Sequence, residues 1–242
     1  VTVTNVNEPP VITSSGGGDT AAVSVAEGTT AVTTVTATDP DAGQILTYTI
    51  VGGADAARFT LNSATGALAF AVPPNFEAPT DADGNNSYIV TVQASDGAGG
   101  LDAQTLTVTL TNVNEAPVIT SDGGGDTASL SVAENTTAVT TVAAIDPDAG
   151  QTVSFSISGG ADAARFVINA ATGVLAFVTP PNFETPGDSN GDNVYVVTVR
   201  ATDNLGLFDA QTLRVSVTNV NEPPVITSNG GGASAIVSVP EN

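Results

Sequence analysis

Hydrophobic and polar residues alternate with a period of two through most of the chain, as in residues 88–92 and 106–110. This alternation is typical of β-strands with one buried face. In the first full copy of the pattern it predicts strands at residues 11–26 (interrupted by glycines 16–18), 31–38, 45–51, 58–61, 67–71, 88–94 and 101–111. Clusters of Gly, Pro, Asn and Asp separate these strands. Only residues 54–57 suggest a single helical turn. Seven short strands in about 100 residues predict an all-β, immunoglobulin-like Greek-key sandwich.

The same pattern returns after 107 residues, because the stretch Asn5-Val6-Asn7-Glu8 recurs at residues 112–115 and again at 219–222. A fixed long period indicates an array of similar modules. We expect the end of a preceding repeat and a linker at 1–8, full repeats at 9–115 and 116–222, and the start of another repeat at 223–242. The chain would then be part of a longer array. Prolines directly after each linker favour sandwiches arranged end to end.

All eight glutamates lie at three positions of the repeat: Glu27, Glu134 and Glu241; Glu77 and Glu184; and Glu8, Glu115 and Glu222. If successive strands alternate in direction, all three positions lie at the same end of the sandwich, the end where the last strand leaves. We call this the downstream end. The aspartates at 39, 41 and 96, and their copies at 146, 148 and 203, lie at the opposite, upstream end.

When one repeat follows another, these two ends meet. The junction between the full repeats is therefore predicted to gather six carboxylates and two amides: Glu27, Glu77, Asn112, Asn114, Glu115, Asp146, Asp148 and Asp203. The incomplete junctions supply the equivalent residues Asn5, Asn7, Glu8, Asp39, Asp41 and Asp96 on one side. On the other side they supply Glu134, Glu184, Asn219, Asn221 and Glu222.

The formal charge of −21, from 25 acidic residues and four arginines, argues against nucleic acid as a partner, because phosphate contacts need a cationic face. Anionic membrane surfaces are disfavoured for the same reason, and we expect no membrane insertion in this fragment. The 41% hydrophobic content speaks against disorder. The chain has no Cys, His, Met or Trp, so the usual zinc, haem and iron–sulfur ligands are missing. Nucleophilic catalysis of the Ser–His or Cys–His type is excluded too, and we expect no catalytic residues.

Bare carboxylates about 5 Å apart would repel each other by about 1.5 kcal/mol per adjacent pair. Oxygen ligands without nitrogen or sulfur match Ca²⁺, which takes about six to eight of them. The junction is therefore predicted to bind Ca²⁺, with about two ions per junction, or three.

Five motifs, in order and repeated, resemble the cadherin repeat in its bacterial cadherin-like form. Residues 35–41 (VTATDPD) resemble A-x-D-x-D, 59–66 (FTLNSATG) resemble F-x-I-D-x-x-T-G, and 88–97 (YIVTVQASDG) resemble Y-x-L-x-V-x-A-x-D-G. Ala26-Glu27 and Pro240-Glu241 stand at P-E, Asn75-Phe76-Glu77 at D-x-E, and residues 112–117 at D-x-N-D-N-x-P, one residue short. The resemblance implies Ca²⁺ held between consecutive repeats by these motifs. Asn75, Asn182 and Asn112 replace acidic residues of the family pattern, which favours two ions over three.

Two functions follow from these patterns. The first is a calcium-stiffened stalk or fibre of a secreted or cell-surface bacterial protein, which supports adhesion and has neighbouring repeats of the same chain as its partners. The alternative is a module that binds exopolysaccharide or a second copy of itself, and exposed aromatic residues would favour it. The loops 81–85 and 188–192 have the D-x-[DN]-G-[DN] spacing of half a calcium loop, but the absence of a downstream bidentate Glu favours an ordinary solvated loop. We also expect Arg58 to pair with Asp55, three residues before it.

Overall fold

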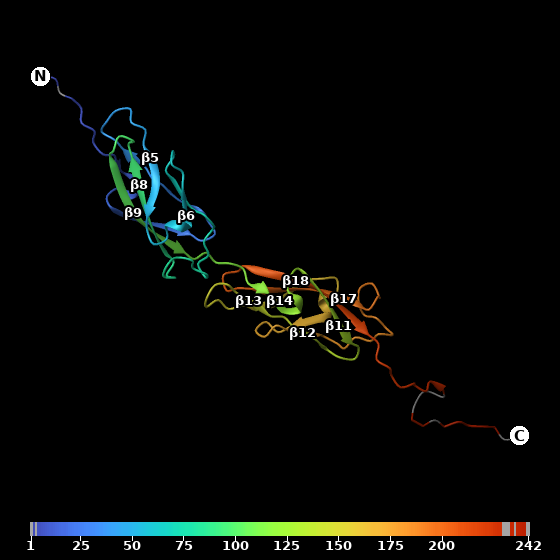
Figure 1. Ribbon diagram of the computed structural model, residues 1–242. Coiled ribbons are helices and arrows are strands. Elements are labelled where there is room, and N and C mark those ends of the chain that lie inside the picture. Colours follow the sequence, from blue (N-terminus) through green and yellow to red (C-terminus); the bar gives the residue numbers. More distant parts are fainter. Residues whose placement is uncertain (1, 3, 229–232, 235, 241–242) are drawn as a thin grey trace. The chain divides into compact units, whose positions relative to one another are not determined.

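The computed structural model describes residues 2, 4–228, 233–234 and 236–240 and divides the chain into two compact units, residues 1–114 and 115–242 (Figure 1). Both units are built from β-strands with short 3-10 turns, so the prediction of tandem all-β domains is confirmed. The repeat boundaries predicted at residues 8/9, 115/116 and 222/223 stay predictions. Glu241 lies outside the described residues.

The first unit contains nine strand segments and two 3-10 turns. These are β1 (Val11–Ile12), η1 (Ser14–Gly16), β2 (Thr20–Ala26), β3 (Ala31–Thr34), β4 (Ala37–Thr38), β5 (Thr47–Gly52), η2 (Ala56–Arg58), β6 (Phe59–Leu61), β7 (Ala67–Phe70), β8 (Ser87–Ser95) and β9 (Leu101–Thr111).

The second unit repeats this order of elements. It contains β10 (Val118–Ile119), η3 (Ser121–Gly123), β11 (Thr127–Ala133), β12 (Ala138–Thr141), β13 (Ala144–Ile145), β14 (Ser154–Gly159), η4 (Ala163–Arg165), β15 (Phe166–Ile168), β16 (Val174–Phe177), β17 (Val194–Thr202) and β18 (Phe208–Thr218).

Each unit has a four-stranded and a three-stranded sheet, with a short two-stranded pair beside them. In the first unit the orders are β2-β9-β8-β5 and β3-β7-β6, and β1 pairs with β4. The second unit has β11-β18-β17-β14, β12-β16-β15 and β10-β13. The chain crosses between the two larger sheets of the first unit from β2 to β3, from β5 to β6 and from β7 to β8, as in a Greek-key sandwich.

The pairing directions confirm that successive strands alternate in direction. Every pair in the first unit is antiparallel except β2 with β9, the first and last long strands, which run parallel. β2 and β9 belong to the first and the seventh of the seven predicted strands. If each connection reverses the chain, the first and seventh strands must run parallel. The connections predicted for the downstream end therefore do lie together at one end of the sandwich.

The predicted strand at residues 31–38 is in fact two segments, β3 and β4, that join different sheets. Between them Val35 is buried, and its N–H donates to the carbonyl of Gly66 at 2.8 Å. Gly66 has a φ of +70°, and a Cβ built there would lie 2.0 Å from the carbonyl oxygen of Val35. This close approach of a turn interrupts the strand ladder, and only glycine allows it.

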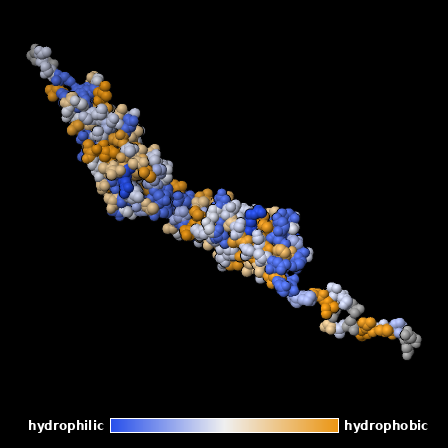
Figure 2. All heavy atoms as spheres, turned by 45° about the vertical axis from the view of Figure 1, so that its right-hand side comes forward, coloured by the Kyte–Doolittle hydropathy of each residue, from blue (hydrophilic) through white to orange (hydrophobic). Residues whose placement is uncertain are grey.

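Each unit encloses its own core, filled from alternate positions of the strands. In β8 the residues Tyr88, Val90, Val92 and Ala94 are all buried, as the period of two predicts. The rings of Phe70 and Tyr88 meet edge to face with centroids 5.1 Å apart, a favourable aromatic geometry. On the face seen in Figure 2, hydrophilic and hydrophobic residues are interspersed over both units.

Candidate metal centre

The downstream end of the second unit brings three glutamates together. One carboxylate oxygen from each of Glu134, Glu184 and Glu222 lies within 4.8 Å of the others. Glu134 follows β11, Glu184 lies in the connection between β16 and β17, and Glu222 follows β18. The three repeat positions reserved for glutamate therefore converge here, as strand direction predicts.

Glu134 also ties the linker to the sandwich. It is buried, and its two carboxylate oxygens accept hydrogen bonds from the backbone N–H groups of Phe183 and Val220, both at 2.8 Å. These donors favour the ionised form and lower the pKa of Glu134, with Phe183 contributing most. The carboxylate is thus held charged at the start of linker 219–222.

Two asparagine side chains donate hydrogen bonds to glutamates at the downstream end of the second unit. Asn219 donates to Glu184 at 2.6 Å, and Asn135 donates to Glu222 at 2.7 Å. Asn135 is not among the predicted site residues, because it stands where the first repeat has Gly28 and the 107-residue period therefore carries no signal for it.

The first unit builds the same arrangement from its own residues. Glu27 accepts hydrogen bonds from the N–H groups of Phe76, at 2.7 Å, and Val113, at 2.8 Å. Asn112 donates to Glu77 at 3.0 Å. Glu115, the counterpart of Glu222, belongs to the second unit, so its role toward Glu27 and Glu77 stays a prediction.

The upstream end of the first unit holds the linker at residues 5–8. Asn5 donates to Asp41, Asn7 donates to Asp96 at 2.7 Å, and the Glu8 N–H donates to Asp41 at 2.9 Å. The hydrogen bond from Asn7, followed by those of the Ala98, Gly100 and Gly99 N–H groups, lowers the pKa of Asp96. The same linker sequence is therefore bound at a downstream end in one unit and at an upstream end in the other.

The second unit repeats the part of the upstream end that lies within it. The Glu115 N–H donates to Asp148 at 2.7 Å, and Asp203 accepts from the N–H groups of Leu205 and Leu207. The metal roles of Asn114 and Asn221 stay predictions.

One carboxylate oxygen at each upstream end is buried without a donor. Oδ1 of Asp39 accepts the Asp41 N–H at 2.8 Å, whereas Oδ2 is buried and has no hydrogen-bond partner. Asp146 repeats this, with its Oδ1 bonded to the Asp148 N–H at 3.0 Å and its Oδ2 unpaired. A buried anionic oxygen without a donor is costly, and a cation satisfies it. These residues therefore fit a hard cation such as Ca²⁺.

The loops at 81–85 and 188–192 have a structural role. Asp81 is buried and accepts the N–H groups of Asn85, at 2.8 Å, and Asn86, at 3.2 Å. Burial raises the pKa of Asp81, but these hydrogen bonds outweigh it, and the net shift is downward. Both oxygens are thus engaged within the loop, as they are in Asp188.

The ion pair expected between Arg58 and Asp55 is not found in the described part of the chain. Asp55 is buried, and its two oxygens accept the N–H groups of Ala82, at 2.7 Å, and Ile89, at 2.8 Å. It fastens the turn before η2 to the neighbouring loop and to β8. Sequence spacing suggested a partner three residues away, whereas the fold supplies donors 27 and 34 residues away.

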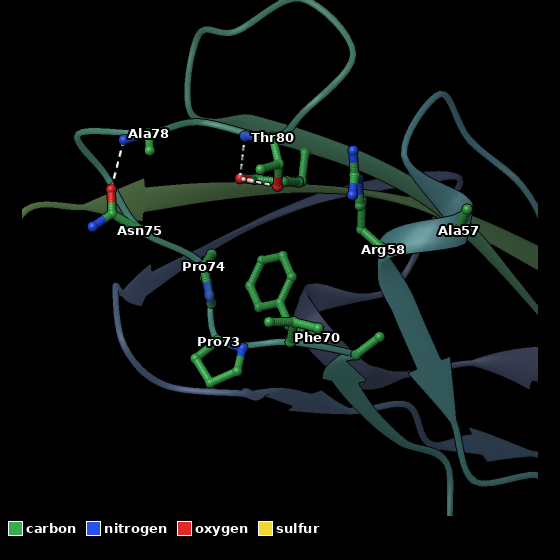
Figure 3. A pocket seen from close by; sticks show the side chains of 11 residues that line it. Ala57, Arg58, Phe70, Pro73, Pro74, Asn75, Ala78 and Thr80 are labelled. Atoms are coloured by element: carbon green, nitrogen blue, oxygen red, sulfur yellow. Dashed lines mark hydrogen bonds between the residues drawn. The ribbon is translucent and has the colours of Figure 1, made fainter.

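A hollow of about 290 Å³ lies beside the connection that carries Glu77. Figure 3 shows the Phe70 ring with Pro73 and Pro74 on one side and Arg58 on the other. The residues that line this hollow include no carboxylate and no histidine. It forms no part of the metal centre.

Aromatic residues offer little exposed surface. Eight of the eleven are buried, Phe76 and Phe183 are half-buried, and Phe208 is the exposed one, with the guanidinium of Arg200 3.8 Å above its ring. The exposed aromatic face that would favour sugar binding is therefore not found. None of the helices in the described part of the chain is long and apolar enough to cross a membrane.

Known proteins are similar to this chain in sequence and in fold. The chain is 31% identical over 242 aligned residues to rat cadherin-23, a match that covers 92% of this chain and 7% of that protein. The human protocadherin-24 EC1-2 crystal structure superposes with a TM-score of 0.53 at 23% identity, covering 90% of this chain and all of that one. The human desmocollin-1 ectodomain gives 0.50 at 20% identity, covering 92% and 43%.

A family model described as Cadherin domain matches residues 21–111 and 128–220. These ranges include β3 to β9 and β12 to β18, together with Glu27, Glu77, Glu134 and Glu184. The chain therefore belongs to the cadherin domain family.

Proposed function

We propose that the chain is a calcium-binding structural segment of a longer extracellular protein, in which ions bound at the linkers stiffen a stalk that supports adhesion. The desmocollin-1 relative is an ectodomain, which supports this location. The chain spans about 7% of the length of rat cadherin-23, so the activity of the whole protein lies beyond this segment.

The observation that carries this proposal is the double use of one linker sequence. At residues 219–222 it is bound by the downstream glutamates, and at residues 5–8 by the upstream aspartates. A linker between two full repeats can make both sets of contacts. Residues 112–115 would then place Glu27 and Glu77 near Asp146, Asp148 and Asp203.

Charge supports calcium at this position. Six carboxylates at the junction would carry six negative charges, and two Ca²⁺ ions would offset four of them. The unpaired buried oxygen of Asp146 is one expected ligand. Asn219 now directs its NH₂ group to Glu184, and its counterpart Asn112 does the same to Glu77. An amide binds a cation through oxygen, so Ca²⁺ binding there requires each amide to rotate.

Small-angle X-ray scattering tests the proposal. With Ca²⁺ we expect a longer and stiffer particle than with chelator, since unneutralised carboxylates repel while each sandwich keeps its own core. Mg²⁺ at the same concentration should have a smaller effect, because its small octahedral shell suits this ligand set poorly.

A matched pair of variants locates the effect. Asp146→Ala with Asp148→Ala should abolish the Ca²⁺-dependent change without unfolding either unit. Asp39→Ala with Asp41→Ala makes the same change at the other linker and should preserve it. A chelated chain that is already as extended and rigid as the loaded one would rule out calcium stiffening.

A further inference from the structure

The loop between β16 and β17 carries two polar residues in the reverse order of its counterpart between β7 and β8. The first repeat has Asp83 and Asn85, whereas the second has Asn190 and Asp192. In each loop the amide donates to the carboxylate, at 2.8 Å in the first and 2.9 Å in the second. The exchange preserves charge and hydrogen bond, but in the second repeat it places an asparagine directly before a glycine.

We infer that Asn190 is a site of spontaneous deamidation in the folded protein. The backbone nitrogen of Gly191 attacks Cγ of Asn190, so that an N–Cγ bond forms and a succinimide ring closes. The Cγ–Nδ2 bond breaks, and ammonia leaves with the proton lost by Gly191. Water then opens the ring at either carbonyl and leaves aspartate or isoaspartate at position 190, without any oxidant or reductant.

The structure leaves this peptide open to the reaction. Asn190 and Gly191 are both exposed. Gly191 has a φ of +75°, and no atom lies within 4 Å of the place where a Cβ would stand, so the space beside its Cα is open. Theirs is the single Asn-Gly pair in the part of the chain that the structure describes.

Hydrogen bonds restrain the backbone on both sides of the Asn190-Gly191 pair, and the pair lies between these restrained residues. The Ser189 N–H is bound by Asp162 at 2.6 Å, and the N–H groups of Asp192 and Asn193 are bound by Asp188. The Asn190 amide is held by one exposed hydrogen bond to Asp192, which water can replace. The Gly191 N–H faces the Asp188 carboxylate, so an acceptor lies beside the proton that must leave.

Deamidation changes the loop locally. It replaces the donor that faces Asp192 with a carboxylate and places three acidic groups within five residues. The protein gains one negative charge, and isoaspartate also lengthens the backbone by one methylene. Because the first repeat has Asp83 at this position, its loop has no amide to lose there.

Peptide mapping by mass spectrometry tests the inference on the intact chain aged in mildly alkaline buffer. We expect conversion at Asn190, seen as the mass change from amide to acid, split between two isomeric peptides and matched by a more acidic species in ion exchange. A free peptide spanning residues 186–196 serves as the unfolded reference. Conversion in the intact chain within a few-fold of the peptide's rate supports the inference.

The repeats supply the control variant. Asn190→Asp together with Asp192→Asn reproduces the order of the first repeat, and it should fold normally and lose conversion at this loop. If the intact chain shows no conversion at Asn190 under conditions that convert the peptide, the folded loop protects the pair and the inference is wrong. Absence of conversion in both the intact chain and the free peptide also overturns the inference.

Discussion

Single residues in these sandwiches act mostly through the backbone groups they satisfy. Asp96, Asp188 and Glu134 each accept at least two backbone N–H groups, and in each the donors lower the pKa of the carboxyl. An ionised carboxylate with two or three amide donors is stabilised without an ion pair to arginine or lysine. This explains how a chain with four arginines keeps so many acidic residues partly buried.

Removal of the Asp188 side chain should destabilise the second unit by about 2 kcal/mol, because two N–H groups lose a charged acceptor. Although burial raises the pKa of Asp188, the hydrogen bonds from Asp192 and Asn193 outweigh it and the net shift is downward. The stabilisation is therefore complete above the ordinary aspartate pKa and is lost as the pH falls through the lowered one.

Denaturant unfolding of the wild type and of Asp188→Ala across that pH range checks this. The difference between them should shrink on acidification. The exposed Asp126→Ala serves as the control and should change stability little. A difference that is independent of pH would contradict this account of Asp188.

Glycines in left-handed conformations should differ in how well they tolerate a side chain. Gly66 and Gly84 have φ values of +70° and +71°, but a Cβ at Gly66 meets the Val35 carbonyl oxygen at 2.0 Å, whereas none is near Gly84. Gly84→Ala should cost about 1 kcal/mol from the backbone conformation alone. Gly66→Ala should cost roughly 3 kcal/mol or more, because strand and turn must move apart. Equal losses in denaturant unfolding would show that the close approach is not rigid.

At the scale of elements, half-buried aspartates hold the short strands in place through backbone N–H groups. Asp102 at the start of β9 accepts the Ile12 N–H at 2.7 Å, and Asp209 does the same for Ile119 at 2.8 Å. These bonds fix the short strands β1 and β10 beside the four-stranded sheets. Carboxylates thus hold the short strands by hydrogen bonds, and apolar side chains fill the core between the sheets.

Asp162 should be a strong determinant of how the 188–193 loop is placed. Its oxygens accept the N–H groups of Ser189, at 2.6 Å, and Val196, at 2.8 Å, and so join the turn before η4 to that loop and to β17. Asp162→Ala leaves both donors without a partner and should destabilise the unit by roughly 2–3 kcal/mol. Hydrogen exchange should rise first at these two amides. Unchanged exchange there would refute the role, and Asp55→Ala is the matched change in the first unit.

At the scale of the whole molecule, the two units have separate cores. The apolar cluster of the first unit contains Leu68 and Val108, and that of the second contains Leu175 and Val215, with no member in common among the described residues. Cores that share no side chains unfold as separate cooperative units unless an interface couples them.

Truncation of one core should therefore leave the other unit intact when Ca²⁺ is chelated. Leu68→Ala and Leu175→Ala each create a cavity and should cost about 2–5 kcal/mol within their own unit. Hydrogen exchange mapped by mass spectrometry should show faster exchange in residues 9–111 for the first variant and in residues 118–218 for the second. Acceleration in both units would show that they are coupled without the metal.

The sequence by itself determined the repeat, the strands, their alternating directions and hence the convergence of Glu134, Glu184 and Glu222 at one end. These features depend on the period of hydrophobic residues and on the number of chain reversals in each repeat. Both can be obtained from the sequence without knowledge of tertiary contacts. Family membership followed from motifs in a fixed order.

Only the tertiary structure decided which acidic residues are structural. Asp55 and Asp102 look like surface or loop acids in the sequence, but the donors to Asp55 are 27 and 34 residues away and a donor to Asp102 is 90 residues away. The break between β3 and β4 is also tertiary, because it depends on the contact of Val35 with Gly66. Spacing along a chain shows which residues share an end of a sandwich. It does not show which backbone N–H group a carboxylate meets there, because the packing of loops from different strands sets that distance.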